Sequence, residues 1–116
     1  MADQNESQLF DKNALLEEFK DEADILQVAI EIFTQKYETI LQEISQAIVA
    51  NDAPKVHFKA HELKGAVSNF RCSGIVESLQ KLEMKGKENE LDEAKELYTE
   101  IESNISALAT QLKKIA

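Results

Sequence analysis

His61 is the residue of this chain best suited to chemistry, because its imidazole is expected to stand on the outer face of a helix. Between residues 53 and 70, apolar residues recur every three or four positions, a spacing typical of a helix face packed on a core. This stripe consists of Val56, Ala60, Leu63, Val67 and Phe70. At about 100° per residue, His61 points away from the stripe. A neutral imidazole is a nucleophile near neutral pH and can form covalent intermediates, so the pattern predicts an exposed nucleophile.

The residues around His61 suit an anion, such as a phosphoryl group or an acidic pocket of a partner. Those that share its face or flank it are His57, Phe58, Lys64, Gly65 and Ser68. Lys64 supplies a cation close enough to offset phosphoryl charge. Gly65 costs about 1 kcal/mol in a helix interior relative to Ala, so a local reason such as open space beside the ring is expected. Ser68 is a candidate to hold the imidazole, directly or through a water.

The segment resembles the histidine-containing phosphotransfer (HPt) domain of bacterial and plant phosphorelays. The family signature is His-x-hydrophobic-Lys-Gly, followed by small residues and then a hydrophobic residue. Residues 61–65 read His-Glu-Leu-Lys-Gly, and Ala66 and Phe70 complete the pattern. In many members a Gly follows that hydrophobic residue, whereas this chain has Arg71.

The resemblance extends from about Asp52 to the C-terminus, and covers the N-terminal half by helical pattern only. Leu82 and Glu83, a turn at Gly86 and a long final helix also fit the family. A phosphorylated histidine has a labile N–P bond and can pass its phosphoryl group to a carboxylate.

The resemblance implies a relay role for His61. It would accept a phosphoryl group from the phospho-Asp of a receiver domain, or from a kinase, and donate it to the Asp of a response regulator. The expected partners are therefore receiver domains, a hybrid histidine kinase, or both. The receiver would supply Mg²⁺ and most catalytic groups, so no cofactor is expected in this chain. The sequence has no Gly-rich nucleotide lid, which predicts a relay intermediate that does not phosphorylate itself.

Several alternatives stay open at this stage. The chain could be the phosphotransfer domain of a larger chemotaxis-type kinase, or a non-catalytic helical adaptor. His57 and His61 have a spacing that can chelate a metal, but two ligands are too few for a stable zinc site, so no metal is expected. His57 is instead expected as a neutral surface residue at the rim of the docking site. Phe58 could contact a partner or pack on a neighbouring helix, and Cys72 is expected to be a packing residue.

The composition limits the classes of protein to which this chain could belong. The 116 residues are enough for one domain, expected to span 1–116, and three Gly and one Pro favour a helical bundle over sandwiches and barrels. A single Cys fits a reducing compartment, and neither a signal peptide nor a long apolar run is present, so a cytoplasmic protein without membrane contact is expected. The net charge of −9 argues against nucleic-acid binding. Residues 53–72 carry four basic side chains and one acidic one, and form the only locally basic stretch.

The periodicity predicts an all-α fold: an antiparallel up-down four-helix bundle with a short additional N-terminal helix. The short helix is capped by Asp11 or Asn13, and a long helix covers about residues 22–50 with Ile25, Val28 and Ile32 in its apolar stripe. The helix that carries His61 runs over residues 53–70, with Asp52 as its N-cap and Pro54 in its first turn. A fourth helix, with Ser73 as a candidate cap, ends near Gly86, and the last covers 91–115. Residues 1–8 are polar and are expected to be flexible.

Overall fold

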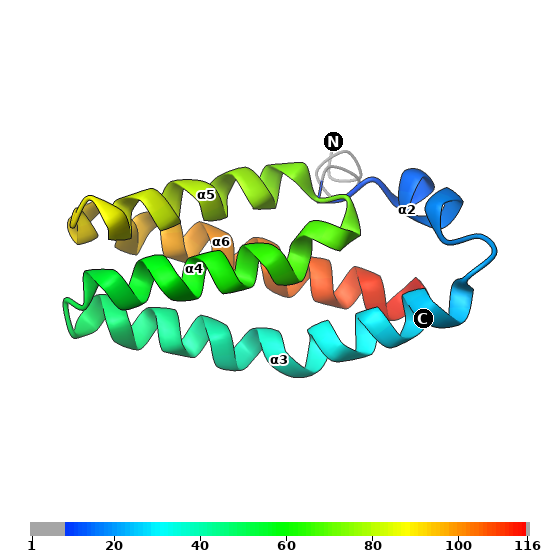
Figure 1. Ribbon diagram of the computed structural model, residues 1–116, viewed down its shortest axis with the longest axis horizontal. Helices are drawn as coiled ribbons and strands as arrows, with labels where there is room; N and C mark the ends of the chain where they lie inside the picture. Colours follow the sequence, from blue (N-terminus) through cyan, green and yellow to red (C-terminus); the bar gives the residue numbers. More distant parts are fainter. Residues whose placement is uncertain (1–8, 116) are drawn as a thin grey trace.

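Five α-helices organise residues 9–115, the part of the chain that the computed structural model describes (Figure 1). Their bounds are α2 Lys12–Glu18, α3 Ala23–Val49, α4 Ala53–Val67, α5 Ser73–Lys87 and α6 Leu91–Ile115. A 3₁₀ turn, η1 Ser68–Phe70, follows α4, and no β-strand occurs in the described range. The predicted all-α class is confirmed. The flexibility expected for residues 1–8 concerns residues outside the described part of the chain.

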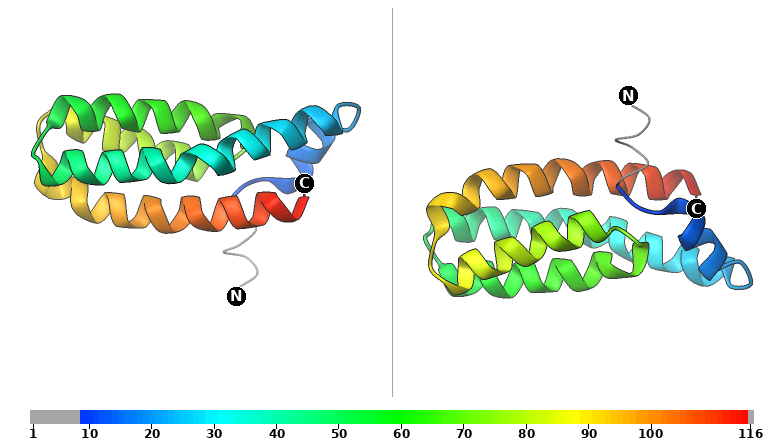
Figure 2. Two further views of the ribbon diagram at one scale, coloured as in Figure 1. Left: turned by 90° about the horizontal axis from the view of Figure 1, so that it is seen from below. Right: turned by 90° about the horizontal axis from the view of Figure 1, so that it is seen from above.

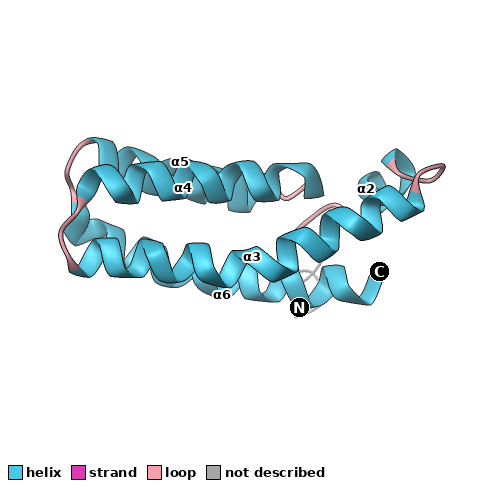
Figure 3. Cartoon of the chain, turned by 60° about the horizontal axis from the view of Figure 1, so that its bottom comes forward, coloured by secondary structure: helices cyan, strands magenta, loops and turns pink. Residues whose placement is uncertain are grey.

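The four long helices form an antiparallel up-down bundle. α3, α4, α5 and α6 alternate in direction, and each packs against two neighbours in the closed order α3–α4–α5–α6. Viewed from the side, α4 and α5 form one layer while α3 and α6 form the other (Figure 3). The short α2 lies at the end of the bundle where α3 begins and α6 ends (Figure 2). Within residues 9–115, no helix has an apolar stretch sufficient to span a bilayer.

The apolar stripe predicted for the helix with His61 is buried. Its five members are all at most 1% exposed, and they are Val56, Ala60, Leu63, Val67 and Phe70. They join buried residues of the other helices in one continuous core. Burial of this stripe fixes the rotation of α4, and therefore determines which of its residues face solvent.

Two of the predicted helix caps are confirmed. The Asp11 carboxylate accepts from the Ala14 N–H at 3.0 Å, and Asp52 accepts from the Lys55 N–H at 3.3 Å. Each satisfies a backbone donor that the first helical turn leaves free. The predicted cap Ser73 is wrong: it is the first residue of α5, and Cys72 precedes it without a side-chain cap bond.

The turn between α4 and α5 is built around a left-handed residue. Arg71 has a φ of 57°, a conformation in which a side chain is strained and Gly is favoured. Its carbonyl accepts the Asp11 N–H at 2.8 Å, and its Nε donates to Glu18 at 3.0 Å. Arg71 therefore ties α2 to this end of the bundle.

Part of the stripe predicted for α3 is not in the core. Ile25, Val28 and Ile32 are 50%, 53% and 49% exposed. The face of this part of α3 that packs inward carries Leu26 and Ile30 instead. α3 also continues past the end of α4, so that helix does not cover its N-terminal turns (Figure 1). The apolar residues of α3 are therefore more than the core can bury.

Candidate functional site

His61 lies near the middle of α4, and its ring is open to solvent. Its side chain is 66% exposed, whereas Ala60 and Leu63 beside it are completely buried. The predicted outward orientation is thus present, and it follows directly from the buried stripe on the opposite face of α4.

A carboxylate from α5 holds the ring. The Nδ1 of His61 is 3.0 Å from Oε2 of Glu83, and the Nζ of Lys64 is 2.8 Å from Oε1 of the same residue. Glu83 is only 15% exposed, and Lys64 is 21% exposed. Burial by itself would raise the pKa of Glu83, but the hydrogen bonds and charges of Lys64 and His61 outweigh burial and lower that pKa. Glu83 is therefore ionised at neutral pH.

The ionised carboxylate selects one form of the ring. A carboxylate only accepts hydrogen bonds, so Nδ1 of His61 carries the proton and donates it to Glu83. In the neutral ring the lone pair then lies on Nε2, at the far side of the imidazole from Glu83. The arrangement presents Nε2 as a nucleophile and places a negative charge behind it.

Gly65 leaves open space beside the ring. A Cβ added at this position would meet no heavy atom within 4 Å, and the residue is exposed. The packing of this chain therefore does not explain why residue 65 is glycine.

Ser68 has a different contact from the one predicted. Its hydroxyl donates to the carbonyl of Gly65 at 3.0 Å, in the last turn of α4. The expectation that Ser68 holds the imidazole directly is wrong, because its hydroxyl is engaged by the backbone and Glu83 holds the ring. Ser68 is nevertheless exposed on the surface near Gly65.

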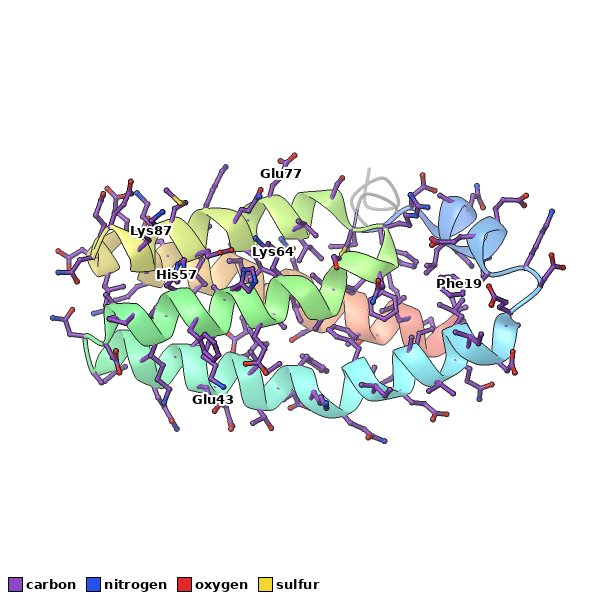
Figure 4. All side chains as sticks on the ribbon, viewed as in Figure 1. Phe19, Glu43, His57, Lys64, Glu77 and Lys87 are labelled. Carbon is purple, nitrogen blue, oxygen red and sulfur yellow. The ribbon has the colours of Figure 1, made fainter. Side chains whose placement is uncertain are left out.

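His57 is not a free surface residue. It is half-buried, and its Nδ1 lies 2.9 Å from the backbone carbonyl of Glu83. A carbonyl only accepts, so Nδ1 of His57 donates. Figure 4 shows His57 and Lys64 on the side of α4 that faces α5. Across residues 9–115, no group of three or more His, Cys, Asp or Glu side chains is arranged to hold a metal ion.

Phe58 is exposed, so its ring does not pack on a neighbouring helix, and contact with a partner stays a prediction. Its side chain is 64% exposed, and Lys59 places its Nζ 5.8 Å from the ring centroid. Lys59 also pairs with Glu43 on α3 at 3.3 Å and with Glu62 at 3.2 Å. An aromatic ring thus lies on the solvent side of α4, one turn before His61.

A shallow groove runs between α3 and α4 on the same side as Glu62. It is lined by Ala29, Ile32, Phe33, Lys36, Tyr37, Ile40, Glu62, Ala66, Asn69 and Phe70. Most of these side chains are apolar or aromatic. The half-exposed Ile32 therefore lies at an apolar groove next to the helix that carries His61.

Comparison with protein families shows to which family this bundle belongs. Residues 14–111 match the family model described as "Hpt domain". The chain belongs to the Hpt domain family. Its function is histidine phosphotransfer in phosphorelays, as its sequence predicted.

The fold of this Hpt domain also has a solved counterpart. The crystal structure of histidine-containing phosphotransfer protein B from Pseudomonas aeruginosa PAO1 superposes with a TM-score of 0.83. The two chains are 24% identical, and the match covers 91% of this chain and 92% of the other. A comparison with curated proteins finds no significant match.

Sequence reasoning missed Glu83 as the partner of His61. The two residues are 22 positions apart, and neither helix periodicity nor the signature around His61 connects them. The antiparallel pairing of α4 and α5 could have found it. Positions equally distant from residue 70 face each other across such a pair, so 57 faces 83 and His61 lies one turn away.

Proposed function

We propose that His61 is the phosphoacceptor of this Hpt domain and that Nε2 is the attacking atom. The observation that carries the proposal is the bond from Nδ1 of an exposed ring to the ionised Glu83. Nε2 attacks the phosphorus of a receiver's phospho-Asp, the N–P bond forms, and the P–O bond to the aspartyl carboxylate breaks. The ring keeps its Nδ1 proton and becomes positively charged, and the Glu83 carboxylate stabilises that charge. In the reverse direction, a second receiver's Asp takes the group and the neutral ring is restored.

Lys64 and Gly65 support the same reaction. Lys64 lies next to His61's partner Glu83 and can turn its ammonium toward a phosphoryl group, whose charge exceeds that of a carboxylate. Gly65 leaves room for the phosphoryl group and the incoming receiver. We assign the Mg²⁺ and the remaining catalytic groups to the receiver and expect no cofactor in this chain.

The partner is proposed to be a receiver domain, free or attached to a hybrid histidine kinase. It would dock over α4, with contacts to Phe58, Gly65 and Ser68 and to the apolar groove between α3 and α4. The exposed aromatic ring of Phe58 supports this, because exposed aromatic residues contribute strongly to binding between proteins. We propose a cytoplasmic location and no partner among nucleic acids or membranes, in keeping with the acidic composition.

The test is phosphoryl transfer from a panel of phosphorylated receivers, followed by mapping of the labelled residue. We expect an acid-labile label on Nε2 of His61 and none on His61→Gln. Label on His57, or label that persists in His61→Gln, would overturn the assignment. Labelling by a kinase but by no receiver would indicate the phosphotransfer domain of a larger kinase. A helical adaptor would take no label and would bind its partner equally well as His61→Gln.

A further inference from the structure

α4 and α5 touch backbone to backbone beside the site. A Cβ added at Gly86 would lie 2.5 Å from the His57 nitrogen, 2.9 Å from its Cα and 2.9 Å from the Ala53 carbonyl oxygen. These are backbone atoms, so no side-chain rotation could relieve the overlap. Gly86 is therefore required for the close approach of α5 to α4, in contrast to Gly65.

The ring of His57 makes a polar bond across this contact. Its Nδ1 donates to the Glu83 carbonyl at 2.9 Å, one turn before Gly86 on α5. A contact at a glycine lets two helices approach closely, but it has no side chain that could fix their register or their rotation relative to each other. The hydrogen bond from His57 is directional and supplies that setting.

Glu83 is consequently held at both ends. Its backbone carbonyl accepts from His57, and its carboxylate accepts from His61 and forms an ion pair with Lys64. A shift of about 1 Å in a catalytic group is enough to lose a productive geometry. The position of Glu83's carboxylate relative to the ring of His61 therefore depends on where its backbone is fixed.

We propose that His57 is a positioning residue for phosphoryl transfer. It fixes the backbone of Glu83 and thereby keeps the carboxylate in reach of Nδ1 of His61. This proposal rests on the proposed role of His61, but it assigns His57 no contact with the phosphoryl group. Its first consequence is the tautomer of His61 in the resting protein, which can be measured without any transfer.

The experiment compares His57→Phe with His57→Asn in the full chain. Phe keeps the ring volume and removes the donor, whereas the Asn amide places an N–H close to the position of Nδ1. Nitrogen-15 NMR of the His61 ring reports which nitrogen carries the proton, and transfer from a phospho-receiver reports the rate. For His57→Phe we expect a mixture of tautomers at His61 and transfer slower by about threefold to tenfold. His57→Asn is expected to have the single His61 tautomer and the transfer rate of the unmodified chain.

Arg71→Ala is the matched control, because it also removes one side-chain bond, but at the opposite end of α5 from Glu83. Its His61 tautomer should be that of the unmodified chain. Gly86→Ala is the second variant, because the added methyl group pushes α5 away from α4 while residue 57 is still histidine. It should show the same mixture of His61 tautomers, and it provides the test if His57→Phe fails to fold.

Two results would overturn the proposal. One is an unchanged His61 tautomer and an unchanged rate in folded His57→Phe. The other is an unchanged tautomer in Gly86→Ala. Failure of the proposed function looks different, because then no receiver labels His61 in the unmodified chain while the tautomer still responds to His57→Phe.

Discussion

Glu83 and His61 together define the chemistry of this Hpt domain at the scale of single residues. The carboxylate orients the ring and holds the Nδ1 proton, and in the proposed reaction it faces the charge that forms when Nε2 is phosphorylated. Lys64 forms an ion pair with the same carboxylate. The nucleophile is thus prepared within this chain, before a partner arrives.

The pH dependence of stability should reveal the ionised Glu83. Its pKa in the folded protein lies below the ordinary value of 4.5, so below that pH the unfolded chain binds more protons. The stabilisation from Glu83 is therefore fully present above about pH 4.5 and is lost as the pH falls through the lower pKa of the folded state. We expect urea unfolding between pH 3 and 7 to show a steeper acid loss in the unmodified chain than in Glu83→Gln. Identical acid slopes would contradict this.

Gly65→Ala should separate stability from function. The added methyl group meets nothing within 4 Å, and Ala is favoured over Gly in a helix by about 1 kcal/mol. We expect the variant to be as stable as the unmodified chain or more so, while transfer slows by on the order of tenfold because the methyl group occupies the partner's space. Gly74→Ala is the control: a Cβ there is equally free of contacts, but it lies in the first turn of α5. Equal transfer rates for the two variants would argue against the assigned role of Gly65.

At the scale of elements, the rotation of α4 and the register of α5 are set by different means. Burial of five apolar residues sets the rotation of α4. The sequence predicts this rotation because it depends on a single segment of the chain. The register of α5 depends on Gly86 and His57, which lie on different helices. His61, Lys64 and Gly65 could accordingly be predicted from local spacing, whereas Glu83 could not.

Other differences from the sequence predictions have the same origin. Ile25, Val28 and Ile32 fit the helical period, but the extent of cover over α3 depends on where α4 ends. His57 shares the outer part of α4 with His61, yet α5 lies close enough to bury it partly. Periodicity gives the orientation of a residue on its own helix and does not give the position of the next helix.

Arg71 offers a test of the turn between α4 and α5. Its left-handed backbone costs an ordinary residue roughly 1–2 kcal/mol, and its exposed pair with Glu18 contributes at most about 1 kcal/mol. Arg71→Gly removes both the backbone strain and the ion pair, so little net change in the free energy of unfolding is expected. Arg71→Ala loses the ion pair but keeps the strain. Arg71→Ala should be less stable than Arg71→Gly by about 1 kcal/mol in urea unfolding. Equal stability of the two variants would show that the strain is smaller than the backbone angle indicates.

At the scale of the whole molecule, Cys72 reports on the integrity of the bundle. It is 2% exposed, and burial raises the pKa of its thiol to about 12, so the reactive thiolate is scarce at pH 8. We expect iodoacetamide to modify Cys72 only as the protein unfolds, with a rate that follows the unfolded fraction across a urea series. Rapid modification in native buffer, at a rate near that of the unfolded chain, would contradict this.

His61 stands exposed near the middle of α4, and Phe58 is also exposed one turn before it. Under the proposed role of His61, two receivers cannot cover that ring at the same moment, so the donor has to dissociate before the acceptor binds. An abundant receiver that dissociates slowly from α4 would therefore delay transfer to every other receiver.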